Sequence, residues 1–262
     1  MRSYLTSLAA IAASIPFIDA HGYVSGIVVG GKWQSGWNPS YQYSSTAPAV
    51  AGWTTTVTDN GFVTPADYAG PDIICHKGAT AAPTSVAVAA GSTIGLEWTV
   101  WPDSHKGPVL DYLASCPGDD CTSVDKSALE FFKIDAGGYI NSTGNGGSWA
   151  SDQLIANNNT WTLTIPSNLK PGGYVLRHEI IALHSAGSTD GAQNYPQCIN
   201  LKVTGSGTVL PTDTVKGTAL YKATDPGILI NIYQTLTSYT IPGPAIPSAL
   251  KAAAKRGMAF VA

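Results

Sequence analysis

The sequence predicts an all-β fold, a β-sandwich whose strands are joined by long loops. Short runs rich in Val, Ile, Thr and aromatic residues recur along the chain, and in Trp161–Ile165 apolar residues alternate with threonines, as in a strand with one buried face. The 262 residues include 28 Gly and 17 Pro, which fall between these runs and indicate turns. A chain of this length suits one large β domain or two small ones.

The expected strands follow from these runs, in chain order. They are Val24–Val29, Trp53–Thr58, Ser85–Val88, Thr93–Val100, Phe131–Ile134, Trp161–Ile165, Tyr174–Leu183 and Ile199–Val203. Gly-rich turns such as Lys170–Gly173 and Gly144–Gly147 separate the later ones. The segment after about Gly205 has few strand signals and many Pro and Gly, so we expect it to wrap the sandwich rather than to form a second domain or a carbohydrate-binding module.

Charge and hydropathy exclude two classes of partner. The chain has 14 basic and 17 acidic residues, a formal net charge of −3, and only 12% charged residues. A basic footprint for nucleic acid is therefore absent. Apart from the N-terminal segment there is no long apolar run, so no membrane span is expected. We expect a monomeric protein, and the N-terminal segment predicts that it is secreted.

The N-terminal segment predicts a secretory signal peptide. Arg2 is followed by an apolar stretch from about Tyr4 to Ile18 and then by the small residue Ala20. Cleavage after Ala20 would make His21 the first residue of a mature domain, residues 21–262. An N-terminal histidine offers its amine and its imidazole to one metal ion. If the cut lies elsewhere, His21 is an ordinary loop residue.

The four cysteines predict two disulfides, because the count is even and a signal peptide precedes them. Cys116 and Cys121 flank a Pro-Gly turn and can close locally, which leaves Cys75 with Cys198. Three pairings are possible in principle, and a four-cysteine zinc site is a weaker alternative because the short paired spacings are missing. The sequons at Asn141 and Asn158 predict N-glycosylation in polar loops.

The remaining histidines are candidates for metal binding or proton transfer. His105 lies in the Pro- and Gly-bounded segment Trp101–Pro108, where it is either a ligand or an exposed histidine. His178 and His184 are expected on one face of the same strand, as a proton donor or as hydrogen-bonded core histidines. The segment His178-Glu-Ile-Ile-Ala182 begins like the zinc-protease motif His-Glu-x-x-His. Its fifth residue is Ala182 rather than histidine, which excludes that motif.

Three further residues complete the set of candidates. Gln193 and Tyr195 share one face of an extended segment, where the phenol is either an axial contact to a metal or a buried tyrosine with a satisfied hydroxyl. His76, beside Cys75, is interpreted as structural.

Taken together, these motifs resemble the fungal lytic polysaccharide monooxygenases of auxiliary activity family 9, formerly glycoside hydrolase family 61. The matching segments are spread over nearly the whole expected mature chain in the order of the family. They are His21–Val24, Pro71–His76, Trp101–Pro108, Leu129–Ile134, Tyr174–His184, Gly191–Cys198 and Asp225–Tyr233. The resemblance implies an immunoglobulin-like or fibronectin-like β-sandwich with a flat substrate face.

The resemblance also implies a role for each candidate residue. His21 supplies an amine and a ring nitrogen to one copper ion, His105 supplies a third nitrogen, and Tyr195 takes the axial position. His184 and Gln193 act beside the metal on the oxygen co-substrate. The implied disulfides are Cys75–Cys198 and Cys116–Cys121. Tyr233 matches a tyrosine that stacks on sugar rings, and Tyr43 is a weaker second match because the Trp33–Tyr43 loop departs from the pattern.

The implied activity is oxidative cleavage of β-1,4-glucan chains of cellulose, at C1 or C4 or both. It needs an external electron donor, such as a small-molecule reductant or a redox partner enzyme, and O2 or H2O2. Three nitrogens with a weak axial oxygen suit Cu(II). Because the nitrogens must be deprotonated to bind, copper affinity should fall in acid.

Three other functions compete with this one. A copper-binding protein without catalysis could keep the same metal ligands but would have little reason for Gln193 and His184. A carboxylate-based endoglucanase needs two carboxylates about 5–10 Å apart, and Asp103 and Glu179 are the available candidates. A non-catalytic β-sandwich carbohydrate-binding protein would use surface aromatic residues but would not need His21 at the new N-terminus.

Overall fold

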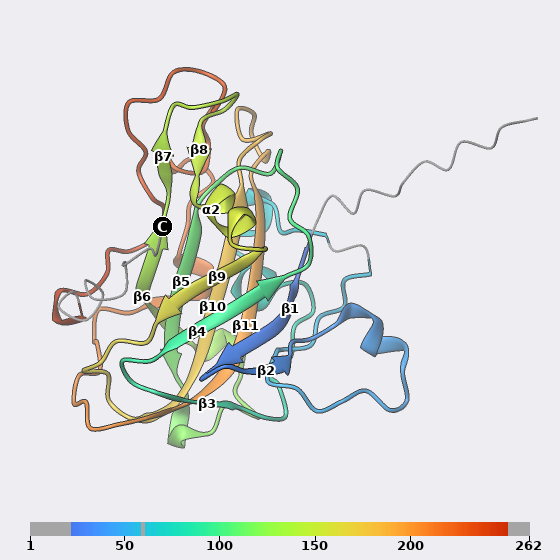
Figure 1. Cartoon of the computed structure of the whole chain (residues 1–262), viewed down its shortest axis with the longest axis vertical. Helices are drawn as coiled ribbons and strands as arrows, with labels where there is room; N and C mark the ends of the chain where they lie inside the picture. Colours follow the sequence, from blue (N-terminus) through green and yellow to red (C-terminus); the bar gives the residue numbers. More distant parts are fainter. Residues whose placement is uncertain (1–21, 59–60, 251–262) are drawn as a thin grey trace, which may run out of the picture.

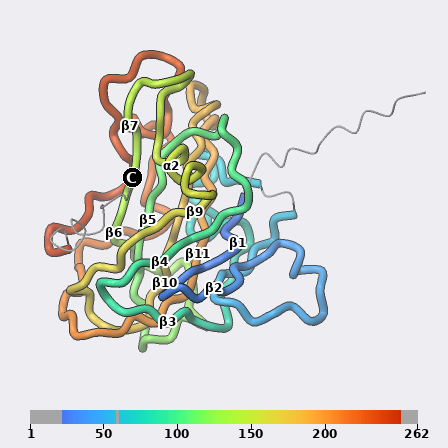
Figure 2. The backbone as a smooth tube through the Cα atoms, viewed as in Figure 1, coloured from blue at the N-terminus to red at the C-terminus, as the bar shows by residue number. Residues whose placement is uncertain are grey.

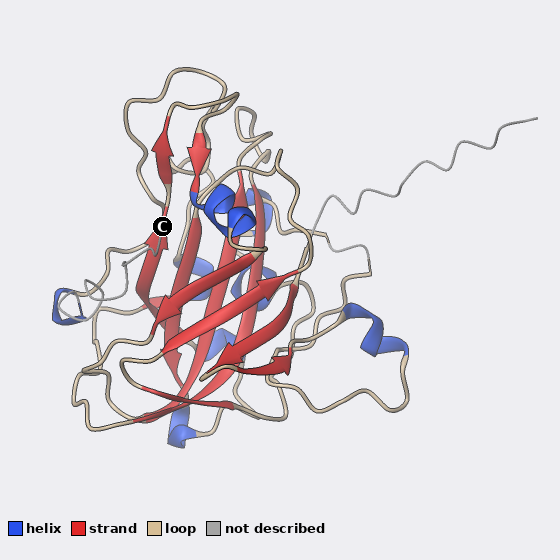
Figure 3. Ribbon diagram, viewed as in Figure 1, coloured by secondary structure: helices blue, strands red, loops and turns tan. Residues whose placement is uncertain are grey.

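Strands dominate the protein, as the sequence predicts (Figure 3). The structure is a computed structural model that describes residues 22–58 and 61–250. The expected signal peptide, residues 1–20, and the expected metal ligand His21 lie outside the described residues.

One layer is a four-stranded sheet in the order β2-β1-β4-β9. Its central strands are β1 (Val24–Val29) and β4 (Thr93–Trp98), with β2 (Lys32–Ser35) and β9 (Thr160–Thr164) at the edges. All its pairings are antiparallel. Ile94, Leu96 and Trp98 are buried on one face of β4, whereas Thr93, Gly95 and Glu97 point the other way.

The second layer is a six-stranded sheet in the order β12-β6-β5-β10-β11-β3 (Figure 1). Its longest strands are the hairpin pair β10 (Gly172–Ala182) and β11 (Gln193–Thr204). The other members are β12 (Val215–Lys216), β6 (Glu130–Gly137), β5 (Val109–Ser115) and β3 (Val86–Ala89). Pairing is antiparallel except between β11 and β3, which run parallel.

The two sheets pack face to face over a hydrophobic core, which confirms the predicted β-sandwich. Ile27 and Leu96 of the four-stranded sheet share this core with Leu113, Leu176 and Leu201 of the six-stranded sheet. Burial of such apolar surface is the main favourable contribution to folding.

The six-stranded sheet is also buried on its other face. A second core there joins Leu110 and Val175 of the sheet to Ile73 of the short helix α1 (Asp72–Cys75), and to Tyr221 and Ile228 of the segment after β11. In Figure 2 this segment, drawn in orange and red, runs beside β6 and β7 (Tyr139–Asn141). As a result every residue of β10 is buried.

Helices are short in the described part of the chain. The α-helices are α1 (Asp72–Cys75) and α2 (Ala150–Ala156). A small hairpin of β7 (Tyr139–Asn141) and β8 (Ser148–Trp149) precedes α2. The 3-10 turns are Pro39–Tyr43, Pro65–Asp67, Pro117–Asp119, Lys126–Ala128, Gly217–Ala219 and Ser248–Leu250. None of the described helices has the length and apolarity needed to cross a membrane.

One predicted strand was wrong, and one central strand of the six-stranded sheet was missed. Trp53–Thr58 is not a strand, although it is rich in β-forming residues. Its backbone makes separate contacts rather than a ladder: an isolated bridge joins Thr54 to Thr80, and Trp53 N–H donates to the Cys198 carbonyl at 2.9 Å. The Trp53 indole Nε1 also donates to Asn200 Oδ1 at 2.7 Å. Conversely, β5 was not predicted, because it is buried on both faces and its sequence lacks alternation.

Both expected disulfides are present. Cys75–Cys198 fastens α1 to β11 across 123 residues of sequence, and Cys116–Cys121 closes a local turn. Cys75–Cys198 lies in the second core, so it fixes α1 to β11, the strand that carries Gln193 and Tyr195.

Candidate metal centre

His105 is held in the loop between β4 and β5. Its backbone N–H donates to the carbonyl of Pro102 at 3.0 Å, and its carbonyl accepts from the indole Nε1 of Trp101 at 3.0 Å. Its ring Nδ1 lies 3.0 Å from the hydroxyl of Ser104. The side chain is buried, so the sequence alternative of an exposed histidine is wrong.

His184 lies next to His105, but not on a strand as expected. Strand β10 ends at Ala182, and His184 begins the following turn. The two imidazole centroids are 4.0 Å apart and the rings are tilted by 41°. The expectation that His178 and His184 share a strand face is therefore wrong, because the strand ends between them.

The backbone explains why these two histidines meet. Leu183 N–H donates to the Lys106 carbonyl at 2.8 Å, and Ile181 N–H donates to the Pro108 carbonyl at 3.1 Å. A side chain at Gly107 would collide with the carbonyl of Ile181. Glycine there lets the loop run directly against the end of β10, which places His105 beside His184.

Gln193 and Tyr195 reach the same end of the sandwich from β11. Ala182 pairs with Gln193 and Ile180 pairs with Tyr195 across the hairpin. The Tyr195 hydroxyl donates to Gln193 Oε1 at 2.8 Å, and the ring is fully buried. The prediction that these two side chains share one face of an extended segment is confirmed by this contact.

Trp101 is the central contact of this cluster, and the sequence analysis missed its role. Its ring centroid lies 5.8 Å from that of His105 and 4.9 Å from that of Tyr195, in edge-on geometry. A side chain at Gly22, the first described residue, would come within 3.3 Å of the Trp101 ring. Gly22, which follows His21 directly, therefore packs against Trp101. The position of Trp101 beside Pro102, at the start of the segment that carries His105, was the available signal.

The described residues alone do not complete a metal site. In residues 22–58 and 61–250, no three His, Cys, Asp or Glu side chains gather as a set of ligands. The set predicted from the sequence includes His21, which lies outside those ranges and is bonded directly to Gly22.

His178 belongs to the sandwich core rather than to this cluster. It is fully buried, its Nε2 accepts from the Trp98 indole at 2.8 Å, and its Nδ1 lies 2.7 Å from Asp111 Oδ1. The alternative of a hydrogen-bonded core histidine is correct for His178. His76 is likewise buried, with its Nδ1 accepting from the Lys77 N–H at 2.8 Å.

The carboxylates required by the endoglucanase alternative do not form a catalytic pair. Glu179 is fully buried and accepts two hydrogen bonds of 2.8 Å from Arg177, whereas Asp103 is exposed. Tyr221 also donates to Glu179. Burial is the main cause that raises the Tyr221 pKa well above its ordinary value, and the negative charge of Glu179 is the second. A carboxylate with these partners cannot meet a substrate.

Tyr233 and Tyr43 are both exposed, at 53% and 74%. Tyr233 follows Ile230, whose N–H donates to the carbonyl of Ala186 in the turn that begins at His184. The segment with Tyr233 therefore lies at the same end as the histidine cluster. Tyr43 ends the turn Pro39–Tyr43, and Pro39 lines a small pocket together with Gly22.

The sequence profile of Auxiliary Activity family 9 (formerly GH61) matches residues 21–240. AA9 family lytic polysaccharide monooxygenase B of Aspergillus tamarii is 60% identical over 91% of this chain, which spans 63% of that relative. AA9 family lytic polysaccharide monooxygenase E of the same organism is 56% identical over 94% of this chain and 99% of the relative.

A solved structure gives the same result. The extended catalytic domain of H. jecorina LPMO9A is 55% identical, with a TM-score of 0.83 over 88% of this chain and 92% of that one. This chain belongs to Auxiliary Activity family 9, whose named relatives here are lytic polysaccharide monooxygenases.

Proposed function

We propose that this member of the family is a copper-dependent monooxygenase that cleaves β-1,4-glucan chains of cellulose by oxidation at C1, C4 or both. The observation that carries the proposal is the cluster of His105, His184, Gln193 and Tyr195. Gly22, the residue after His21, packs against Trp101 in this cluster. When bound, the copper ion would take electrons from an external donor and use O2 or H2O2 to oxidise a C–H bond beside the glycosidic bond.

The donor atoms of this chain fit such an ion. Removal of residues 1–20 gives His21 a free amine, which with its ring supplies two nitrogens. His105 supplies a third, through Nε2, the ring nitrogen that Ser104 does not contact. Imidazole and amine nitrogens with a phenol oxygen from Tyr195 are donors that Cu(II) prefers.

The neighbouring residues have separate tasks. Trp101 packs edge-on against both His105 and Tyr195 and so holds the two rings in position. Gln193 orients the Tyr195 hydroxyl through their hydrogen bond. His184 donates a hydrogen bond, or a proton, to the oxygen co-substrate from its place beside His105.

The exposed tyrosines serve substrate binding. Tyr233 lies at the same end of the sandwich as the histidines and stacks on a sugar ring, and Tyr43 is a second contact. A flat face carrying these rings suits a crystalline chain that no cleft admits. We also propose that residues 21–262 act as a single, secreted, monomeric catalytic domain with glycans at Asn141 and Asn158.

Mass spectrometry tests this proposal in two steps. The intact mass of the secreted and deglycosylated protein should correspond to a start at His21. Incubation with cellulose should release oxidised oligosaccharides only with a reductant such as ascorbate, and chelation of copper should abolish their release. A start at any other residue, or hydrolytic products that persist after chelation, would contradict it.

A further inference from the structure

The outer face of the four-stranded sheet is hollowed by glycine. Gly26 lies on β1 and Gly95 on β4, the two central strands. The strand register places both residues on the face of the sheet that points away from the core. A groove of about 680 Å³ lies along Gly95, and the Trp33 indole occupies the space beside Gly26. Glycine weakens a strand interior, and it often marks a place where another group approaches the backbone closely.

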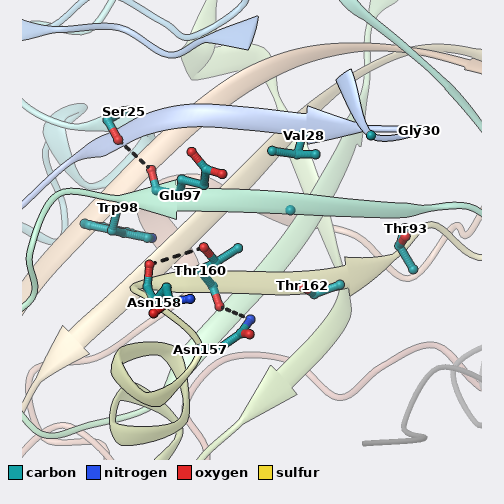
Figure 4. A pocket seen from close by; sticks show the side chains of 12 residues that line it. Ser25, Val28, Gly30, Thr93, Glu97, Trp98, Asn157, Asn158, Thr160 and Thr162 are labelled. Carbon is teal, nitrogen blue, oxygen red and sulfur yellow. Dashed lines mark hydrogen bonds between the residues drawn. The ribbon is translucent and has the colours of Figure 1, made fainter. Parts of the chain in front are cut away.

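Polar side chains surround this groove. Thr160 and Thr162 face it from β9, Glu97 and Thr93 from β4, and Ser25 from β1 (Figure 4). Hydroxyl and carboxylate groups of this kind donate to and accept from the hydroxyls of a sugar. The lining therefore offers hydrogen bonds across its whole width, and its charge comes from one carboxylate.

Trp33 provides an aromatic surface at the opposite edge. It pairs with Val28 across β1 and β2, and its side chain is 57% exposed. Its indole Nε1 donates to Glu97 Oε2 at 2.8 Å, and a side chain at Gly26 would collide with the ring. The indole thus lies beside Gly26 while much of it is exposed to solvent, where it can serve as an aromatic platform for a sugar ring.

Asn158 stands at the β9 side of the same groove and carries the sequon Asn158-Asn-Thr160. Its side chain is exposed, and its left-handed backbone, with φ of 53°, forms the turn between α2 and β9. This turn is anchored, because the Asn159 side chain accepts from the Trp101 N–H at 2.9 Å. The backbone of this turn therefore holds Asn158 at the β9 side of the groove.

We propose that this groove is a saccharide-binding site and that its occupant is the N-linked glycan of Asn158. During secretion, the host transferase joins Asn158 Nδ2 to the anomeric carbon of the first sugar. The lipid diphosphate donor leaves and one amide proton is lost. The sugars then cross β9, β4 and β1 toward Trp33, a distance of about 14 Å at the usual strand spacing.

Covalent attachment makes weak contacts sufficient. A tethered ligand experiences an effective concentration on the order of millimolar, so a few hydrogen bonds and one stacked ring hold it without high intrinsic affinity. The bound glycan covers the edge strand β2, whose outer backbone groups lack a neighbouring strand in the four-stranded sheet. It is thus expected to slow local opening at this edge.

The test compares four proteins secreted from a glycosylating fungal host: wild type, Asn158→Gln, Asn141→Gln and Trp33→Ala. Glycopeptide mass spectrometry reports occupancy, hydrogen exchange reports local opening of residues 30–35, and NMR reports the Trp33 indole N–H. Wild type should carry a glycan on Asn158. Trimming it to one sugar should raise exchange in residues 30–35 several-fold and shift the Trp33 signal.

The variants separate this effect from that of glycans in general. Asn158→Gln should behave as trimmed wild type, and Asn141→Gln, which lacks the glycan on the β7–β8 hairpin, should behave as untrimmed wild type. In Trp33→Ala, trimming should no longer change the exchange. An unoccupied Asn158, or an occupied one whose trimming leaves residues 30–35 and Trp33 unchanged, would overturn the proposal. Equal binding of free cello-oligosaccharide at Trp33 in wild type and in Asn158→Gln would overturn it too.

Discussion

His105 and His184, far apart in sequence, lie with their ring centroids 4.0 Å apart at one end of the sandwich. The contact exists because the loop after β4 forms backbone hydrogen bonds with the end of β10, and because Gly107 permits that approach. The proposed division of labour between the two histidines, one for the metal and one for the oxygen co-substrate, leads to opposite predictions for their removal.

His105→Ala should lose most of its affinity for copper. Only the two nitrogens of His21 would remain, and these do not complete a three-nitrogen planar site. Titration calorimetry with Cu(II) measures the loss, and circular dichroism serves as the folding control. Affinity close to that of wild type in a folded variant would show that His105 is not a ligand.

His184→Ala should retain copper but release few or no oxidised oligosaccharides. Its imidazole is assigned to hydrogen bonding and proton transfer, which matter after metal loading. The same calorimetric titration should give one copper per chain, while product analysis with ascorbate or peroxide should show the loss. Wild-type yields from the loaded variant would remove His184 from the mechanism.

Tyr195→Phe should bind copper and remain folded, but with an altered electron paramagnetic resonance spectrum and slower turnover. The buried ring keeps its contact with Trp101, so the packing is preserved, whereas the hydroxyl and its hydrogen bond to Gln193 are lost. An unchanged spectrum would mean that the phenol does not approach the metal. Complete loss of copper would mean that it is a main ligand.

Tyr233→Ala should weaken binding to cellulose by on the order of 1 kcal/mol, the scale of one aromatic contact. The melting temperature should change little, because the ring is 53% exposed. Pull-down isotherms on crystalline cellulose and thermal melts measure the two quantities, with Tyr43→Ala as a parallel variant. A melting temperature lower by many degrees would show that the ring is part of the packing instead.

Asp135→Asn should stabilise the protein at neutral pH. Burial, with the charge of Asp111 opposite it in the sheet, raises the Asp135 pKa to about 6. A raised carboxyl pKa means that the folded state binds the proton more tightly. The favourable contribution is therefore complete below about pH 4 and is lost as the pH rises through 6.

The gain from Asp135→Asn should thus appear above pH 6 and vanish near pH 4, with an upper limit of about 3 kcal/mol. Urea unfolding at a series of pH values between 4 and 8 measures it. Asp213→Asn, at an exposed carboxylate, is the matched control and should show no such trend. A gain that is independent of pH would point to packing rather than charge.

Local patterns in the sequence were enough for much of the sandwich. Alternation and β-branched residues predicted β1 with the bounds it has, and most of β4, β9, β10 and the later part of β11. Propensity failed at Trp53–Thr58, where no neighbouring strand supplies a ladder, and at β5, whose two buried faces remove the alternation. Strand formation depends on partners that a local pattern does not contain.

The same division applies to the site. The sequence by itself determined which side chains have metal-binding chemistry, the disulfide Cys116–Cys121 from its short turn, and the order of motifs that identifies the family. Only the tertiary structure decided that His178 pairs with Asp111 in the core while His184 meets His105, and that Trp101 supports both His105 and Tyr195. It also decided that Gly95, Glu97 and Asn158 line one groove, with Trp33 bonded to Glu97. The physical reason is that these contacts join distant segments, and their formation depends on sheet register and on where each strand ends.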